Sequence, residues 1–199
     1  SQRQQSPAPG SRPASSHGSR SSCSTGVRPL QRPRSRPKVE ALEDGISEEF
    51  LERYCGESDL ASVEYVEMQA DSAIYNVEAL GFYLPNLRQL RLSDSSIMCI
   101  RELGASLHNL EVLWMSRCGL QDLDGVTILG SLQELYLPFN DVADLSELKW
   151  LDSLAVLDIE GNAVTGLGDV AELRKCHQLR DLTLTGNPVC RDGGYSRDA

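Results

Sequence analysis

The feature that most constrains the fold of this chain is a segment that recurs five times from Leu84 onward. The copies read LPNLRQLRLSDSSI, LHNLEVLWMSRCGL, LGSLQELYLPFNDV, LDSLAVLDIEGNAV and CHQLRDLTLTGNPV. Their leading leucines are spaced 23, 22, 22 and 25 residues apart at Leu87, Leu110, Leu132, Leu154 and Leu179. One copy of this length cannot bury its apolar face alone, so the period predicts a stack of repeats.

Each copy follows the leucine-rich repeat template L-x-x-L-x-L-x-x-N/C-x-L. The alternation Leu135-Tyr136-Leu137 is the two-residue period of a strand with one buried face. Between Leu120 and Leu129 apolar residues fall at every third position, which is the period of a 3₁₀ helix. The predicted fold class is an α/β repeat, a leucine-rich repeat solenoid of about five to six repeats. Its short parallel strands should form the concave face, and 3₁₀ or helical turns the convex face.

A polar residue is expected where each strand ends and the chain turns inward. Asn140, Asn162 and Asn187 stand at this position, and Cys118 fills it in its own repeat. An asparagine side chain both donates and accepts hydrogen bonds, so it can satisfy main-chain groups on either side. We predict that these four residues form a structural turn ladder, with Cys118 and Cys176 buried as small apolar side chains.

Composition divides the chain into three parts. Residues 1–38 are rich in Ser, Pro and Gly and hold eight basic residues and no acidic one, which predicts a disordered basic tail. Residues 39–62 should contain an N-terminal capping helix, from Ser47 to Tyr54, and a linker. Residues 63–199 should form the repeat domain, beginning with a degenerate repeat and ending with an incomplete C-terminal cap.

The charge of the chain is uneven and excludes several classes of partner. The whole sequence has a formal net charge of −10, so residues 39–199 carry −18. An acidic body is unsuited to nucleic-acid phosphates, and no apolar run is long enough to span a membrane. The six cysteines lack the C-x-x-C spacing of a zinc site. We expect a monomer that binds proteins and needs no cofactor.

The repeats also predict which side chains face a partner. Alignment brings Arg91, Trp114, Tyr136, Asp158 and Thr183 to one strand position, directed away from the core. Val112, Pro138 and Phe139 should extend an apolar patch, and Glu134 should join an acidic half. The alternative is that the aromatic side chains only shield the sheet. The predicted partner-binding residues on the concave face are Arg91, Trp114, Arg117, Tyr136, Phe139, Asp158 and Glu160.

Asp158 and Glu160 are the one pair of carboxylates that could act as a general acid and base. No histidine or serine nucleophile aligns with them, and the predicted surface is open to water. His108 and His177 fall in turns before their strands, so no set of three metal ligands converges. We therefore predict no catalytic residues and no metal site.

Several segments carry a resemblance that goes beyond template leucines. VLWMSRCGLQDLDGV at Val112–Val126, together with LQELYLPFNDVADLSEL and LTLTGNPVC, closely resembles the leucine-rich repeat-containing protein 56 family. The resemblance covers residues 46–190. It implies a non-catalytic adaptor of cytoplasm and cilium or flagellum, with intraflagellar transport or axonemal dynein components as partners, for assembly of outer dynein arms. Phosphatase regulators and leucine-rich proteins of RNA–protein complexes share the repeat spacing and stay as alternatives.

Overall fold

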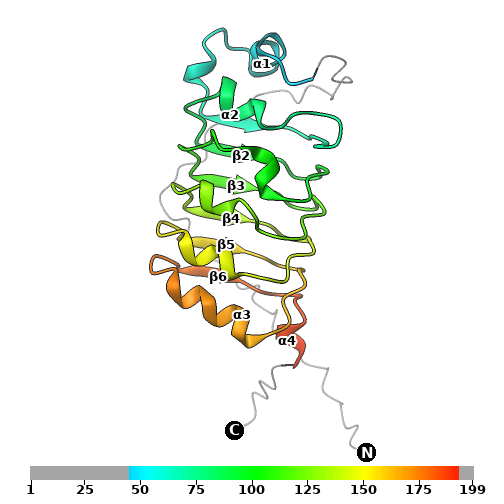
Figure 1. Ribbon diagram of the computed structural model, residues 1–199, viewed down its shortest axis with the longest axis vertical. Coiled ribbons are helices and arrows are strands. Elements are labelled where there is room, and N and C mark those ends of the chain that lie inside the picture. The colour runs from blue at the N-terminus through cyan, green and yellow to red at the C-terminus, as the bar shows by residue number, and fades with distance from the viewer. Residues whose placement is uncertain (1–44, 193–199) are drawn as a thin grey trace, which may run out of the picture.

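The computed structural model describes residues 45–192, which form a coil of stacked repeats (Figure 1). The predicted basic tail, residues 1–38, lies outside the described residues. Within the described part, six parallel strands pair in chain order into one sheet. They are β1 (Tyr65–Glu67), β2 (Gln89–Arg91), β3 (Val112–Trp114), β4 (Glu134–Tyr136), β5 (Val156–Asp158) and β6 (Asp181–Thr183). The predicted leucine-rich repeat solenoid is confirmed.

The core is built from one inward apolar residue of each strand, a leucine in β2 to β6 and Val66 in β1, and from its neighbours in the coil. Leu90, Leu113, Leu135 and Leu157 are paired in register on adjacent strands, and each is at most 1% exposed. Complete burial of a leucine side chain contributes about 1.5–3 kcal/mol. Because the same position is filled in successive repeats, the apolar interior runs without interruption from β2 to β5.

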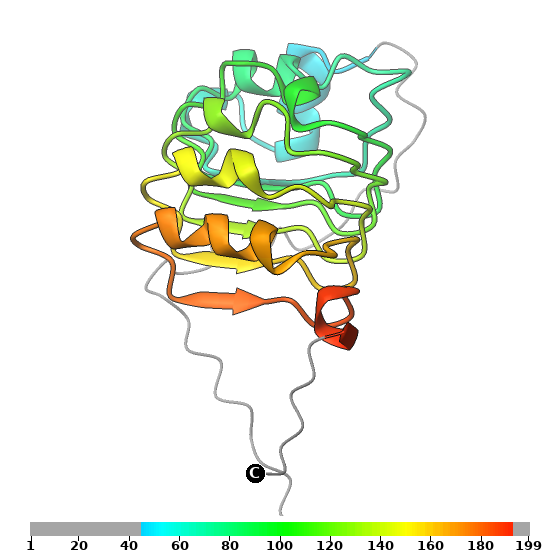
Figure 2. The same cartoon turned by 60° about the horizontal axis from the view of Figure 1, so that its bottom comes forward.

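Short helical turns cover the opposite side of the coil from the sheet (Figure 2). The sequence predicted 3₁₀ turns here, and the structure has them only as brief segments joined by irregular chain. They are η2 (Ile100–Leu103), η3 (Val126–Ile128), η4 (Ser146–Trp150) and η5 (Leu173–Lys175). The added residues of the longest repeat form the short helix α3 (Leu167–Glu172) ahead of η5.

A helix lies over the amino-terminal end of the stack. Helix α1 (Glu48–Cys55) begins where Ser47 Oγ accepts from the backbone N–H of Phe50 at 3.2 Å, as the sequence predicted. Leu51 is fully buried, and Tyr54 Oη donates to the carbonyl of Glu67 in β1 at 2.5 Å. The turn η1 (Leu60–Ser62) leads into the first repeat, which also holds the short helix α2 (Ala79–Tyr83).

The two ends of the described stack differ in burial. Leu182 of β6 occupies the strand position that Leu157 fills in β5, yet it is 40% exposed where Leu157 is 1% exposed. The short helix α4 (Val189–Asp192) follows β6 at the edge of the coil. Over residues 45–192 no helix is long and apolar enough to cross a membrane.

Candidate protein-binding surface

The parallel register aligns side chains of successive strands on the face of the sheet turned away from the helices, here called the concave face. Arg91 pairs with Trp114, Trp114 with Tyr136, Tyr136 with Asp158, and Asp158 with Thr183. The sequence aligned the same five positions. Side chains alternate along a strand, so these residues point away from the buried leucines between them.

An aromatic pair occupies the middle of this row. The rings of Trp114 and Tyr136 are stacked, with centroids 5.5 Å apart and planes 11° from parallel. Tyr136 Oη donates to Glu134 Oε2 at 2.8 Å. Burial raises the pKa of Tyr136, and the hydrogen bond to Glu134 raises it further. The phenol therefore keeps its proton, and the two stacked rings form one fixed aromatic unit on the concave face.

The apolar patch around this pair is smaller than the sequence predicted. Val112 was expected to extend it, but this side chain is only 1% exposed. In the register it stands between Gln89 and Glu134, which are themselves 3% and 9% exposed. Longer neighbours on both adjacent strands therefore cover the short valine, which adds no apolar surface to the stacked pair.

Carboxylates predominate on the concave face beyond the aromatic pair. Asp158 and Glu160 lie on β5 and its continuation, and Asp181 opens β6. Asp158 Oδ1 accepts from the backbone N–H of Glu160 at 3.0 Å, which fixes the carboxylate at the end of the strand. Ion pairs to these three carboxylates are absent among residues 45–192, whereas Arg91 lies 3.7 Å from Glu67 at the other end of the sheet. The concave face is thus negative toward β6.

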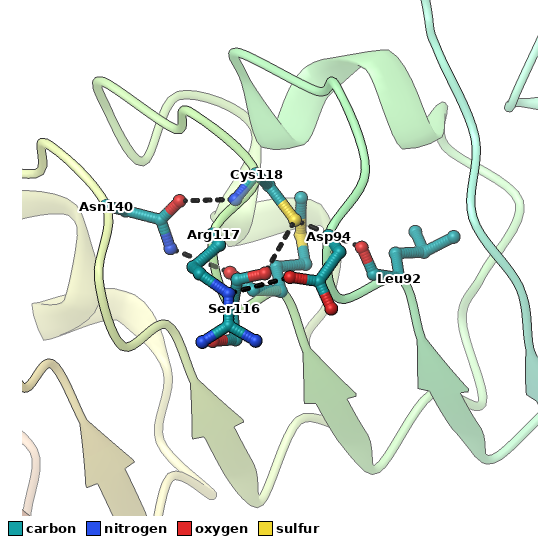
Figure 3. Close-up of polar contacts among 7 residues, drawn as sticks. Leu92, Asp94, Ser116, Arg117, Cys118 and Asn140 are labelled. Atoms are coloured by element: carbon teal, nitrogen blue, oxygen red, sulfur yellow. Dashed lines mark hydrogen bonds and ion pairs between the residues drawn. The ribbon is translucent and has the colours of Figure 1, made fainter.

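Arg117 and Phe139, two of the predicted partner-binding residues, lie outside the strand rows, at the border of the concave face. Both have a positive φ, 53° and 60°, in the turn that follows their strands. Arg117 Nε lies 2.7 Å from Asp94 Oδ1 in the same turn of the preceding repeat (Figure 3). A left-handed backbone is uncommon for residues of these types, so the conformation of the turn, and not the alternation of the strand, sets where their side chains point.

Phe139 packs against the next repeat. A Cβ atom built on Gly161 would stand 2.6 Å from the Phe139 ring, so the ring lies directly against the backbone of that glycine. The phenylalanine is nevertheless 50% exposed. It borders the concave face without extending the stacked pair.

The inner turn is held by side-chain hydrogen bonds that link neighbouring repeats. Asn140 Oδ1 accepts from the backbone N–H groups of Cys118 and Leu120 at 2.9 and 3.1 Å. Its Nδ2 donates to the carbonyls of Met115 and Leu137 at 2.7 and 3.0 Å, and Figure 3 shows how the amide bridges the two turns. Each asparagine therefore ties two repeats together.

The same bonds recur along the ladder. Asn162 accepts from Val142 N–H at 3.0 Å and donates to the Leu137 carbonyl at 2.8 Å. Asn187 accepts from Val164 N–H at 3.0 Å and donates to the Ile159 carbonyl at 2.7 Å. Both asparagines are buried, so these bonds replace water contacts that the main-chain groups have lost.

Cys118 performs part of this role with a thiol. Its Sγ donates to the Leu92 carbonyl at 3.0 Å (Figure 3), the bond that corresponds to Asn140 with Met115. Burial raises the pKa of the Cys118 thiol, which stays protonated and able to donate. Ser95 fills the same position one repeat earlier, where its Oγ accepts from Ala70 N–H at 3.0 Å. Sequence analysis missed Ser95 because the template names asparagine or cysteine there.

Metal binding finds no support in the described residues. No group of three His, Cys, Asp or Glu side chains within 45–192 is placed to hold an ion. His108 and His177 are both exposed in turns. The concave face carries the stacked pair Trp114–Tyr136 and the carboxylates of Asp158, Glu160 and Asp181 on a rigid sheet. These are features of a binding surface.

A coil of parallel strands with a turn ladder defines this chain as a leucine-rich repeat protein, a class whose extended rigid surfaces serve protein–protein interaction. No family model matches the chain. Among solved structures, internalin C2 of Listeria monocytogenes has the same fold, with a TM-score of 0.55 and 20% identity over 70% of this chain and 63% of that one.

Within this class, the chain is a relative of leucine-rich repeat-containing protein 56. It is 44% identical to the Homo sapiens protein over 157 residues, 79% of this chain and 29% of that protein. A Trypanosoma brucei brucei homolog is 35% identical over 150 residues, which cover 73% of this chain and 20% of the homolog. The resemblance inferred from the motifs is confirmed. The chain spans less than a third of the length of these relatives.

Proposed function

We propose that this protein is a non-catalytic adaptor that helps to assemble or transport the outer dynein arms of cilia or flagella. Its partners would be intraflagellar transport or axonemal dynein components, and it would work in the cytoplasm and the cilium or flagellum. The resemblance to leucine-rich repeat-containing protein 56 supports this role. The solenoid itself supports the coarser part of the proposal, the binding of proteins.

The concave face is the proposed binding surface, and the stacked pair Trp114–Tyr136 is the observation that carries it. The two rings are fixed by stacking and by the bond from Tyr136 to Glu134, so a partner need not order them on binding. Aromatic side chains in such a position are typical anchors of protein interfaces. The carboxylates beside them favour a partner segment that carries basic side chains.

A double substitution tests this surface. Trp114→Ala with Tyr136→Ala should lower partner capture from extracts of ciliated cells by at least about tenfold, since loss of anchor residues typically costs 2 kcal/mol or more. Both side chains point away from the leucine core, and the unfolding midpoint should shift far less than capture does. Capture is measured by quantitative mass spectrometry of the bound proteins.

Two exposed aromatic residues outside the concave face provide the matched control. Trp150 in η4 is 62% exposed and Phe82 in α2 is 74% exposed. Trp150→Ala with Phe82→Ala removes a comparable ring area and should leave capture intact. Equal losses in the two double variants would refute the concave face as the binding surface.

Deletion in a ciliated or flagellated cell tests the cellular role. Axoneme cross-sections should lose outer dynein arms, and the wild-type gene should restore them where the Trp114→Ala, Tyr136→Ala variant does not. Outer arms at normal density, together with normal beating, would overturn the assignment to this pathway.

A further inference from the structure

A short basic segment of this chain matches the charge of the acidic end of the concave face. Residues Arg32–Lys38 read RPRSRPK and carry a basic side chain at every second position. In an extended chain alternate side chains share one face, about 6.6 Å apart. Four positive charges can therefore face one surface at once, and the segment contains no acidic residue to oppose them.

The concave face offers the complementary surface. The carboxylates of Asp158, Glu160 and Asp181 make no ion pair with residues 45–192, and Asp158 is held in place by its bond to the Glu160 main chain. Tyr136 pairs with Asp158 in the same row, and Trp114 stacks on the ring of Tyr136 from the next strand. An arginine can stack on such a ring while its guanidinium donates to a neighbouring carboxylate.

The lengths of chain and sheet are compatible. The described chain starts at Gly45, ahead of α1, whose last turn contacts β1 through Tyr54. Adjacent strands are about 4.8 Å apart, which places β5 about 19 Å from β1. Lys38 lies seven residue steps before Gly45, a length of chain that can span about 25 Å when extended. This length is comparable with the distance from β1 to β5, and an extended Arg32–Lys38 can lie across β3 to β6, the strands that carry the aromatic pair and the carboxylates.

We propose that Arg32–Lys38 docks in cis on the concave face, against Trp114, Tyr136 and the carboxylates of Asp158, Glu160 and Asp181. The segment then competes with the basic partner segment that binds the same surface, so a partner must displace it. This competition rests on the proposed function of the concave face. Tethering gives the segment a local concentration in the millimolar range, enough for a weakly binding segment to occupy the surface most of the time.

Fluorescence of Trp114 measures this docking without any partner. The chain has two tryptophans, and Trp150→Phe leaves Trp114 as the single reporter on an otherwise intact chain. In that background, Arg32→Gln, Arg34→Gln, Arg36→Gln and Lys38→Gln should raise acrylamide quenching of Trp114 at least about twofold at low salt. The difference should vanish near 1 M NaCl, where the Debye length falls to about 3 Å.

A peptide of residues 27–38, VRPLQRPRSRPK, provides a second measurement. Added in trans, it should bind the fourfold glutamine variant at least about tenfold more tightly than the parent chain, whose site is occupied in cis. Asp158→Asn, Glu160→Gln and Asp181→Asn should abolish binding to either chain. As a matched control, Asp141→Asn, Glu147→Gln and Asp152→Asn removes three charges elsewhere on the coil and should leave binding unchanged.

Equal quenching of Trp114 in the parent and the glutamine variant at low salt would overturn the proposal. So would equal losses of peptide binding in the two acid-neutralised chains, because the attraction would then be general and not site-specific. Partner capture separates the two ideas. If the Trp114→Ala, Tyr136→Ala variant loses partner capture but the glutamine substitutions do not change the quenching of Trp114, only the cis docking is wrong. If the quenching changes as expected but the alanine variant still captures partners, the proposed binding surface is wrong, and so is the competition between segment and partner.

Discussion

The asparagines of the inner turn matter most at the scale of single residues, because each one satisfies main-chain groups of two repeats. Asn162 is buried and its amide bonds to groups on both sides of the turn. A leucine of similar size at this position would leave those groups buried without partners. We expect Asn162→Leu to lower the free energy of unfolding by about 1–3 kcal/mol, as measured by urea denaturation.

Asn109 is the matched control for this substitution. It is exposed, and its Nδ2 donates only to the carbonyl of Pro85. Water can replace that bond, so Asn109→Leu should change the free energy of unfolding by less than about 0.5 kcal/mol. Equal denaturation midpoints for the parent and Asn162→Leu would refute the structural role of the ladder.

Thiol reactivity should separate the buried cysteines from the exposed one. Burial raises the pKa of the Cys118 and Cys176 thiols, so at any pH below those values the fraction of reactive thiolate is reduced. Cys190 is exposed. In the native chain at about pH 8, iodoacetamide should label Cys190 at least about tenfold faster than either buried thiol. Labelling is followed by peptide mapping.

The sign of the pH effect provides a further check. Because the pKa is raised, the labelling rate of Cys118 should keep increasing at pH values above 9, the ordinary value for a thiol. In denaturant the three cysteines should react at similar rates. Rapid labelling of Cys118 in the folded chain would contradict its place in the turn ladder.

At the scale of single elements, the strands show how much each repeat depends on its neighbours. Leu135 in β4 has a repeat on either side and is fully buried, whereas Leu182 at the equivalent position of β6 is 40% exposed. Leu135→Ala should cost about 2–5 kcal/mol, because it opens a cavity in the middle of the stack.

Leu182→Ala changes the same side chain at the same strand position and should cost less than half as much. Both variants are compared by thermal and urea unfolding, with a single transition expected for Leu135→Ala, since each repeat is stabilised by its neighbours. Equal costs at the two positions would show that β6 is covered in solution.

At the scale of the whole molecule, charge should keep the chain monomeric. Residues 39–199 carry a formal charge of −18, and two concave faces of the same sign repel each other. Multi-angle light scattering at low salt should give the 21.9 kDa mass of one chain. A dimer that dissociates on Leu182→Glu would instead show that the exposed end of β6 associates.

The period of the sequence determined most of the architecture. Strand positions, the inward leucines, the helix capped by Ser47 and the turn positions of Asn140, Asn162 and Asn187 all follow from local pattern. The strands and inward leucines follow from two-residue alternation, the helix from the capping chemistry of serine, and the turns from asparagine at a fixed place in the repeat. The alignment of Arg91, Trp114, Tyr136 and Asp158 could be predicted for the same reason, since the template leucines on either side fix the place of each residue in its strand.

The tertiary structure decided what the period does not encode. The burial of Val112 depends on the sizes of its neighbours on adjacent strands, Gln89 and Glu134. The placement of Arg117 and Phe139 at the sheet edge depends on a left-handed backbone, which could not be predicted from an arginine or a phenylalanine. Ser95 took a ladder position because a hydroxyl there reaches the Ala70 amide. Periodicity assigns a residue to a position in the repeat, but contacts between repeats decide how much of its side chain reaches the surface.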